Sequence, residues 1–280
     1  MAEGGWFSRL FAAGPAQPGE AFGGPGQGRS LAISIVTSLG LFLLWYGVTW
    51  LEVVPPLFLP SPGVVFEKAI EVATDGFGGA TLLDHTLVSM QRVFGAFFFA
   101  ALTAIPIGLM MGVNRVMRGI FDPPIEFYRP IPPLAYLPLM VIWFGIGERT
   151  KIIIIFLAVF APMALNARAG VRSVAIEQIH AAYSMGAPRW QILWHVILKG
   201  AMPEILTGMR IGIGFGWTTL VAAELVAAQA GLGAMIQQAS DFLVTDVAIM
   251  GIVVIGAIAY LFDLIMRGME RLLVPWKGKG

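Results

Sequence analysis

The chain has 280 residues, of which 57% are hydrophobic and only 12% are charged, and its formal net charge is +1. Soluble domains carry about twice that share of charged residues, so lipid must face part of this molecule. The balanced charge and the lack of basic clusters argue against nucleic acid as a partner.

The first 30 residues are rich in Gly and Pro, which predicts a flexible cytoplasmic tail. Residues 6–13, WFSRLFAA, differ because their apolar side chains would share one helical face. We therefore expect either a short helix on the membrane surface here or a continuation of the tail.

Six apolar segments approach the length of about 20 residues that a helix needs to cross a bilayer. They run over residues 31–54, 86–113, 134–146, 152–167, 205–228 and 247–266. The third and fourth are short and are separated only by GERTK, which allows one tight helical hairpin. The pattern predicts an all-α membrane protein with one transmembrane domain over residues 31–274 and a cytoplasmic tail over residues 275–280.

The positions of Lys and Arg predict the orientation, because these residues gather in cytoplasmic loops. If the N-terminus is inside, only Lys68, Arg92, Arg149 and Lys151 of the 18 Lys and Arg residues fall outside. Both termini are therefore predicted to be cytoplasmic. At the cytoplasmic boundary of the fifth span we expect Glu204 and Arg210 to form an ion pair.

Glycines at a spacing of four residues predict close contacts between spans. Gly108 and Gly112 lie in the second span, and Gly208, Gly212 and Gly216 lie in the fifth. Membrane helices with such a face can bring their backbones together.

Candidates for metal or catalytic chemistry are few. The sequence has no Cys, and His85, His180 and His195 do not fall in a metal-ligand spacing. His85 beside Asp84 is the nearest approach to a catalytic pair, but it stands alone in an outside loop. We expect no metal site and no catalytic residues, with a membrane enzyme as a lesser alternative.

A polar segment of about residues 169–203 lies between the fourth and fifth spans, on the cytoplasmic side. In its first half, Ile176, Ile179 and Tyr183 would share one helical side. Ala181 and Ala182 would leave a smooth surface for a second protein to approach closely.

The second half of this segment begins after Gly186, which is typical of a left-handed helix end. Pro188 can open a second helix, whose apolar stripe is Trp190, Leu193, Trp194 and Ile197. The pattern predicts a helix–turn–helix outside the bilayer, and a hairpin that merely connects two spans would fit the same periodicity.

This spacing resembles the coupling motif of ABC-importer permeases: Glu-Ala-Ala, three residues, Gly, nine residues and Ile-x-Leu-Pro. The matching positions are Ala181, Ala182, Gly186, Val196 and Leu198. His180 stands where Glu is usual, and Lys199 stands where Pro is usual.

The resemblance extends over nearly the whole chain after the tail. DPPIEFYRPIPPLAYLPLMVIWFGIGE (122–148), EILTGMRIGIGFGWTTLVAAELVAA (204–228) and FLVTDV (242–247) resemble permeases of the taurine, sulfonate and nitrate family, and YRPIPPLAYLP resembles the taurine branch most. Related permeases for aliphatic sulfonates, nitrate and bicarbonate share the architecture.

The resemblance implies a type I ABC-importer permease (MetI-like) fold with six transmembrane helices, in a bacterial inner membrane. Its expected partners are a second copy of itself, two cytoplasmic ABC ATPases and a periplasmic binding protein that delivers the substrate. The residues implied in coupling to the ATPases are Glu177, His180, Ala181, Ala182, Ser184, Gly186, Ala187 and Arg189.

The energy source is expected to lie outside this chain. The sequence contains no G-x-x-x-x-G-K-[ST], so it lacks the usual loop that holds ATP phosphates. ATP and Mg²⁺ would be bound by the partner ATPases, and this chain needs no cofactor. An ion-coupled carrier is a further alternative, but few acids lie within the spans.

Polar residues inside the spans are candidates for the substrate path. They are Asn166, Trp217, Thr218, Thr219 and Glu224. Hydroxyl and indole donors suit a sulfonate, and a carboxylate suits the ammonium group of taurine. The same residues would also serve simple helix packing.

Overall fold

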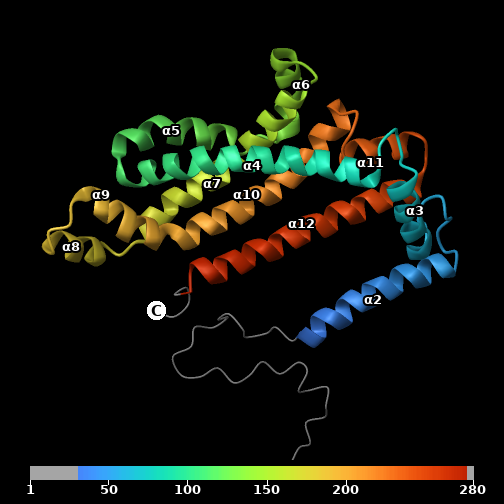
Figure 1. Cartoon of the computed structure of the whole chain (residues 1–280), viewed down its shortest axis with the longest axis horizontal. Helices are drawn as coiled ribbons and strands as arrows, with labels where there is room; N and C mark the ends of the chain where they lie inside the picture. The colour runs from blue at the N-terminus through green and yellow to red at the C-terminus, as the bar shows by residue number, and fades with distance from the viewer. Residues whose placement is uncertain (1–30, 276–280) are drawn as a thin grey trace, which may run out of the picture.

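The computed structural model describes residues 31–275, and within them the chain is helical apart from turns and one isolated β-bridge (Figure 1). The elements are α2 Leu31–Trp50, α3 Pro62–Thr74, α4 Leu82–Val113, α5 Arg115–Tyr128, α6 Pro133–Phe144, α7 Glu148–Ser173, α8 Ile176–Ser184, α9 Arg189–Gln191, the π-helix η1 Ile192–Ile197, α10 Leu198–Ala227, α11 Leu232–Asp241 and α12 Thr245–Leu273. The all-α prediction is confirmed. The predicted tail over residues 1–30, with its possible helix at 6–13, lies outside the described residues, as do residues 276–280 of the C-terminal tail.

Four helices among the described residues are long and apolar enough to cross a bilayer. They are Leu82–Val113, Glu148–Ser173, the continuous run Arg189–Val226 and Thr245–Leu273, and shorter apolar helices cover Ser34–Trp50 and Pro133–Phe144. Each predicted segment therefore coincides with a helix over most of its length, although α2 ends at Trp50 and α6 at Phe144, short of the predicted ends at 54 and 146. The hairpin between the third and fourth differs in detail, because α7 already begins at Glu148 and most of GERTK forms its first turn.

Helix α7 is the centre of the bundle and packs against both α4 and α10. Buried Ala and Val side chains, including Ala100, Ala104 and Val159, fill the contact. The predicted glycine contacts are confirmed: a Cβ on Gly212 would lie 3.2 Å from Val159, and one on Gly208 would lie 2.6 Å from the Cβ of Asn166. Small residues thus allow the three helices to approach closely.

Helix caps fix the start of the elements at one end of the molecule. Thr81 and Asp84 form a capping box before α4, and the Ser61 hydroxyl caps α3. In α3, Lys68 binds Glu71 at 2.8 Å and lies 3.7 Å from Asp246 of α12. The hydrogen bond to Glu71 raises the pKa of Lys68.

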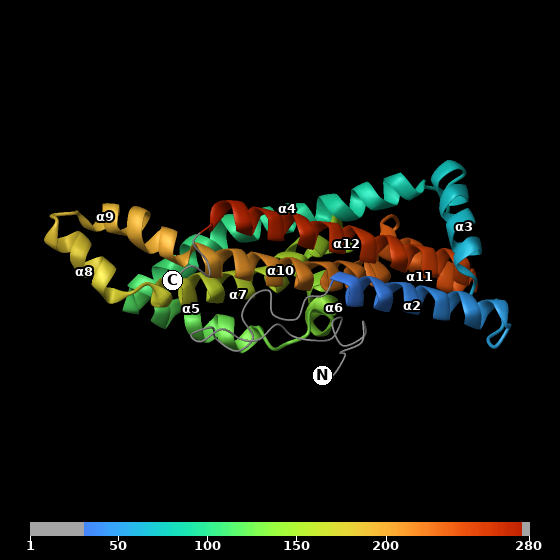
Figure 2. The ribbon, with the colours of Figure 1, turned by 90° about the horizontal axis from the view of Figure 1, so that it is seen from below.

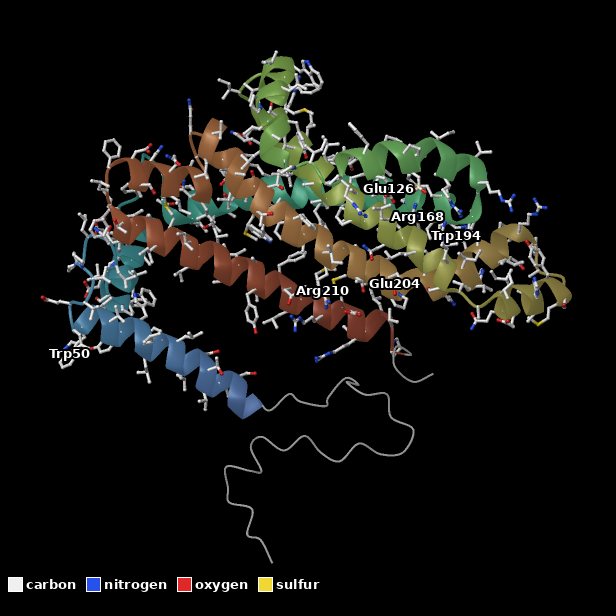
Figure 3. The ribbon with its side chains drawn as sticks, turned by 180° about the vertical axis from the view of Figure 1, so that it is seen from behind. Trp50, Glu126, Arg168, Trp194, Glu204 and Arg210 are labelled. Carbon is white, nitrogen blue, oxygen red and sulfur yellow. The ribbon has the colours of Figure 1, made fainter. Side chains whose placement is uncertain are left out.

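Helix α5 is not among the predicted segments, and Pro123 and Pro124 lie within it. It forms nevertheless, and it packs against α4. Arg168 of α7 reaches Asp122 and lies 3.6 Å from Glu126, which ties α5 to α7 (Figure 3). Ion pairing across helices thus accompanies a segment that its local sequence disfavours.

The predicted ion pair between Glu204 and Arg210 is wrong, because Arg210 pairs with helix α12 instead. It lies 3.9 Å from Asp263 and 3.6 Å from Glu270, both on α12. Residues six positions apart on a helix point about 120° away from each other, because successive residues turn by about 100°. Glu204 and Arg210 therefore lie on different sides of α10, and both are labelled in Figure 3.

The molecule is elongated, with α8 and α9 at one end and α3 and α11 at the other (Figures 1 and 2). Large apolar side chains remain exposed along α2 and α12, for example Leu43 and Leu44 at 64% and Tyr260 at 64%. Such surfaces suit lipid rather than water.

Candidate functional site

The end of the molecule at α8 carries the segment predicted to couple to a partner. Helix α8 ends because Gly186 adopts a φ of 82°, which favours glycine. The Ala187 amide donates to the Ala182 carbonyl at 3.1 Å, and the Gly186 amide donates to Tyr183 at 2.9 Å. The predicted left-handed turn at Gly186 is confirmed.

The predicted coupling residues divide into an inner and an outer group. Ala182 is 6% exposed and packs with Val171, Ile192 and Ile197, which fasten the segment to the bundle. Ala187 is half-buried beside them. The outer group is exposed and consists of Glu177, His180, Ala181, Ser184, Gly186 and Arg189. We call this outer group the α8 face.

The second half of the segment is not a separate helix. Pro188 caps α9, and the chain then continues through the π-helix η1 directly into α10. Of the predicted apolar stripe, Ile197 is buried and Leu193 is half-buried, whereas Trp190 and Trp194 are 60% and 59% exposed. The α8 face is therefore joined to a membrane helix without a break.

The predicted path residues on α10 do not converge. Trp217 and Thr219 are buried, and the Trp217 Nε1 has no hydrogen-bond partner among the described residues. Thr218 is exposed and donates to the Phe215 carbonyl at 3.0 Å. Successive residues of a helix point in different directions, so these three side chains cannot line one surface.

Asn166 of α7 lies at a cavity of about 540 Å³ between α5, α6, α7 and α10. Tyr128, Tyr136 and Phe215 line the same cavity. The Asn166 amide donates to the Pro162 carbonyl at 2.8 Å. Its side-chain oxygen can accept a further hydrogen bond. Of the predicted path residues, Asn166 is the one that lines this cavity.

Glu224 lies in a buried polar network instead. Its side chain is fully buried and accepts from Arg92 at 2.6 Å and from Ser89 at 2.8 Å. It also accepts from the Gly233 amide at 2.8 Å. A buried carboxylate is stable only when it is paired and hydrogen-bonded in this way.

The network also caps α11. The Gly231 amide donates to the His85 Nδ1 at 3.1 Å, and the Leu232 amide donates to Ser89 at 2.8 Å. His85 Nε2 lies 2.9 Å from the Phe77 carbonyl, so this nitrogen carries the proton and Nδ1 accepts. His85 is thus a structural residue: its two ring nitrogens contact the Phe77 carbonyl and the Gly231 amide, whereas the Asp84 carboxylate accepts from Thr81.

Two further charged residues complete the network at the start of α7. Glu148 accepts from Arg92 Nε and Nη2, each at 2.6 Å, and from Lys151 Nζ at 2.8 Å. The sequence places Arg92 and Lys151 outside the membrane but does not indicate their partners. Paired charges within apolar helices are a signal for such a network, although sequence alone does not show which ones meet.

A model of the family described as binding-protein-dependent transport system inner membrane component matches residues 104–278. The chain is 55% identical to the taurine transport system permease protein TauC of Escherichia coli strain K12, over 90% of this chain and 92% of the relative. The chain belongs to this permease family.

The permease has more distant relatives as well. It is 31% identical to the putative aliphatic sulfonates transport permease protein SsuC of Bacillus subtilis strain 168, over 85% of this chain and 84% of the relative. It is also 31% identical to the riboflavin transport system permease protein RibX of Chloroflexus aurantiacus, over 86% of this chain and 89% of the relative.

Solved structures agree on the fold. A chain of the inward-facing MetNI methionine ABC transporter superposes with a TM-score of 0.59 at 20% identity, covering 69% of this permease and 95% of that chain. The permease therefore has the type I importer fold, and it is a multi-pass membrane protein.

Proposed function

We propose that this permease is the membrane subunit of an ATP-driven importer for taurine. The observation that carries the proposal is the 55% identity to TauC over 252 residues, which spans almost all of both chains. The more distant relatives act on different solutes by name, so the level of identity favours taurine over the other substrates of the family.

The proposed complex contains two copies of the permease, two cytoplasmic ATPases and a periplasmic binding protein. The α8 face supports the ATPase contact, because it is exposed at one tip of the molecule and presents the small residues Ala181 and Gly186. Small residues allow a partner's backbone to approach closely. Glu177, His180, Ser184 and Arg189 surround them with polar groups.

Transport would proceed by alternating access. ATP binding closes the two ATPases and moves the docked α8, and the membrane helices shift from an inward-facing to an outward-facing state. The cavity at Asn166 is a candidate part of the path, with Tyr128 and Tyr136 as further polar groups. Trp217, Thr218 and Thr219 would line the path only in a second conformational state in which α10 is rotated about its axis.

Both termini are proposed to be cytoplasmic, which places the α8 face inside and α3 and α11 outside in the inner membrane of a bacterium. The exposed residues Trp50 and Trp194 lie toward opposite ends of the molecule (Figure 3). Trp is enriched at both membrane–water interfaces, which supports a bundle whose long axis crosses the bilayer, whereas the inside and outside ends follow from the Lys and Arg bias.

Uptake of radiolabelled taurine tests the proposal directly. Cells with the complete transporter should accumulate taurine, and a partner ATPase that binds but cannot hydrolyse ATP should reduce uptake to background. Equal permease levels on an immunoblot provide the control. If uptake continues with the inactive ATPase but stops when a proton uncoupler is added, the chain is an ion-coupled carrier instead.

Aliphatic sulfonates are the second candidate substrates, because SsuC of Bacillus subtilis is a relative at 31% identity. A large excess of unlabelled ethanesulfonate should leave taurine uptake almost unchanged if taurine is preferred. Complete competition would assign the permease to the sulfonate branch.

A further inference from the structure

Arg92 and Lys151 form a pair of buried cations on one side of the network. Each side chain is only 4% exposed, and Arg92 belongs to α4 whereas Lys151 belongs to α7. Two like charges held together away from water require an anion between them. In this structure the anion is the carboxylate of Glu148.

The two carboxylates that bind Arg92 differ in how firmly they are held. Glu224 is 0% exposed and has additional donors in Ser89 and the Gly233 amide. Glu148 is 57% exposed, and its side-chain donors within residues 31–275 are Arg92 and Lys151. Glu224 is therefore a fixed part of the network, whereas Glu148 can exchange its partners for water.

The position of Glu148 in the chain also allows it to move. It is the first residue of α7, directly after the turn that contains Gly145 and Gly147. Gly145 has a φ of 78°, and a Cβ on either glycine would meet no atom within 4 Å. The turn before Glu148 is thus not packed against other side chains, which leaves room for this end of α7 to adjust.

The arrangement left behind would suit an oxyanion. Arg92 Nη1 is held by Glu224 at 2.6 Å and by the Ala230 carbonyl at 2.7 Å, so its Nε and Nη2 form a fixed fork that faces Glu148. Lys151 Nζ adds a third donor beside this fork. Fork-shaped pairing with two oxygens is the preferred mode of Arg with carboxylates and similar anions.

Space for a small solute adjoins these donors. A cavity of about 680 Å³ is lined by Arg92, Glu148 and Lys151, with Gln91 and Gln229 at its wall. Ala230 borders it in the turn before α11, at the end of the molecule opposite the α8 face (Figures 1 and 2). In the proposed orientation this cavity opens on the side from which substrate is delivered.

We propose that Arg92 and Lys151 form an entry site for the sulfonate group of the substrate, which Glu148 occupies when substrate is absent. This inference rests on the proposed function and adds a binding site to it. The sulfonate oxygens take the place of the Glu148 carboxylate on the Arg92 fork and on Lys151. The released Glu148 then pairs with the ammonium group at the other end of the same solute.

A zwitterion fits this exchange better than a simple anion does. Before and after the exchange, every cation has an anion beside it, so no charge is left unpaired near the membrane. A sulfonate without an ammonium group would bind the same cations but would leave Glu148 to water alone. The site therefore favours aminosulfonates over plain sulfonates.

Equilibrium binding to the full chain in lipid nanodiscs tests the site, with radiolabelled taurine as the probe. The wild type should bind taurine weakly, and Lys151→Met should weaken binding about tenfold, whereas Lys151→Arg should preserve it. Glu148→Gln should strengthen binding of ethanesulfonate about tenfold, because the competing carboxylate is gone. Glu71→Gln is the matched control, since it removes the acid of another Lys–Glu pair spaced three residues apart on a helix. It should leave the affinity for both taurine and ethanesulfonate unchanged.

The outcomes separate this site from the function on which it rests. If Glu148→Gln gains no affinity for ethanesulfonate and Lys151→Met does not weaken taurine binding, the network is structural and the site is wrong, even if cells import taurine normally. If the variants change taurine and ethanesulfonate binding as expected but the complete transporter imports no taurine, the binding site is supported and the proposed transport substrate is wrong. Thermal unfolding of each variant shows whether it is folded.

Discussion

At the scale of single residues, the ion pair between Arg92 and Glu224 is the most deeply buried ion pair given by the described residues. The two side chains are 4% and 0% exposed and lie 2.6 Å apart. Separating such a pair leaves one charge in an apolar region, which costs far more than the loss of one hydrogen bond. The pair also holds the turn before α11, because Gly233 and Ala230 bind the same two side chains.

Glu224→Gln should therefore destabilise the permease by about 3 kcal/mol, since it removes one partner of a buried ion pair. The measurement is thermal unfolding in detergent, followed by the amount of monodisperse protein. Glu126→Gln is a suitable control, because Glu126 is half exposed and lies 3.6 Å from its Arg168 partner. It should cost less than about 1 kcal/mol.

A double variant distinguishes charge from packing. Arg92→Met with Glu224→Leu removes both charges, so its loss of stability should be smaller than the sum of the two single losses. If the loss of stability in the double variant equals the sum of the two single losses, the interaction between Arg92 and Glu224 does not stabilise the fold.

Sequence reasoning at this scale found the residues but not their partners. The sequence identifies Glu224 as an acid within a span and leaves open whether it faces a substrate or serves helix packing. Its true neighbours, Ser89 and Arg92, lie more than 130 positions away in the chain. Only the packing of α10 on α4 brings them together, and no local pattern contains that information.

At the scale of elements, the turn at Gly186 was predictable and helix α5 was not. A glycine between two periodic segments has few alternatives, because its φ of 82° is unfavourable for other residues. Helix α5 contains Pro123 and Pro124, which normally argue against a helix. Contacts with α4 and α7 override that local preference.

The α8 face gives the prediction at this scale. Ala181→Asp should reduce co-purification of the ATPase and transport-linked ATP hydrolysis about tenfold or more, since a charge would be buried without a partner. Ala182 is unsuitable for this test, because it is buried within the permease itself. Ala73→Asp provides the control, as Ala73 is an exposed alanine of α3 at the opposite end. Full coupling in Ala181→Asp would show that the ATPase docks elsewhere.

At the scale of the whole molecule, the distribution of Lys and Arg predicts an orientation that the arrangement of helices makes easy to test. The α8 face and α3 lie at opposite ends (Figure 1). The sequence contains no Cys, so any single introduced cysteine is the only thiol. Labelling therefore reports on one position at a time.

A membrane-impermeant maleimide should label Glu71→Cys in cells with an intact inner membrane. It should label His180→Cys only after the membrane is permeabilised, because α8 is proposed to be cytoplasmic. Both side chains are exposed, so accessibility to solvent is matched. The reverse pattern would invert the proposed topology and place the ATPase contact on the wrong side.

The unbroken run from Arg189 to Val226 has a mechanical consequence. At about 1.5 Å per residue, its 38 residues form a rod roughly 57 Å long. One end of this run adjoins the α8 face. The other end carries Glu224, which forms the buried ion pair with Arg92. If the proposed ATPase contact forms at the α8 face, a tilt imposed there would reach Glu224 through this one helical run, which passes through the π-helix at Ile192–Ile197.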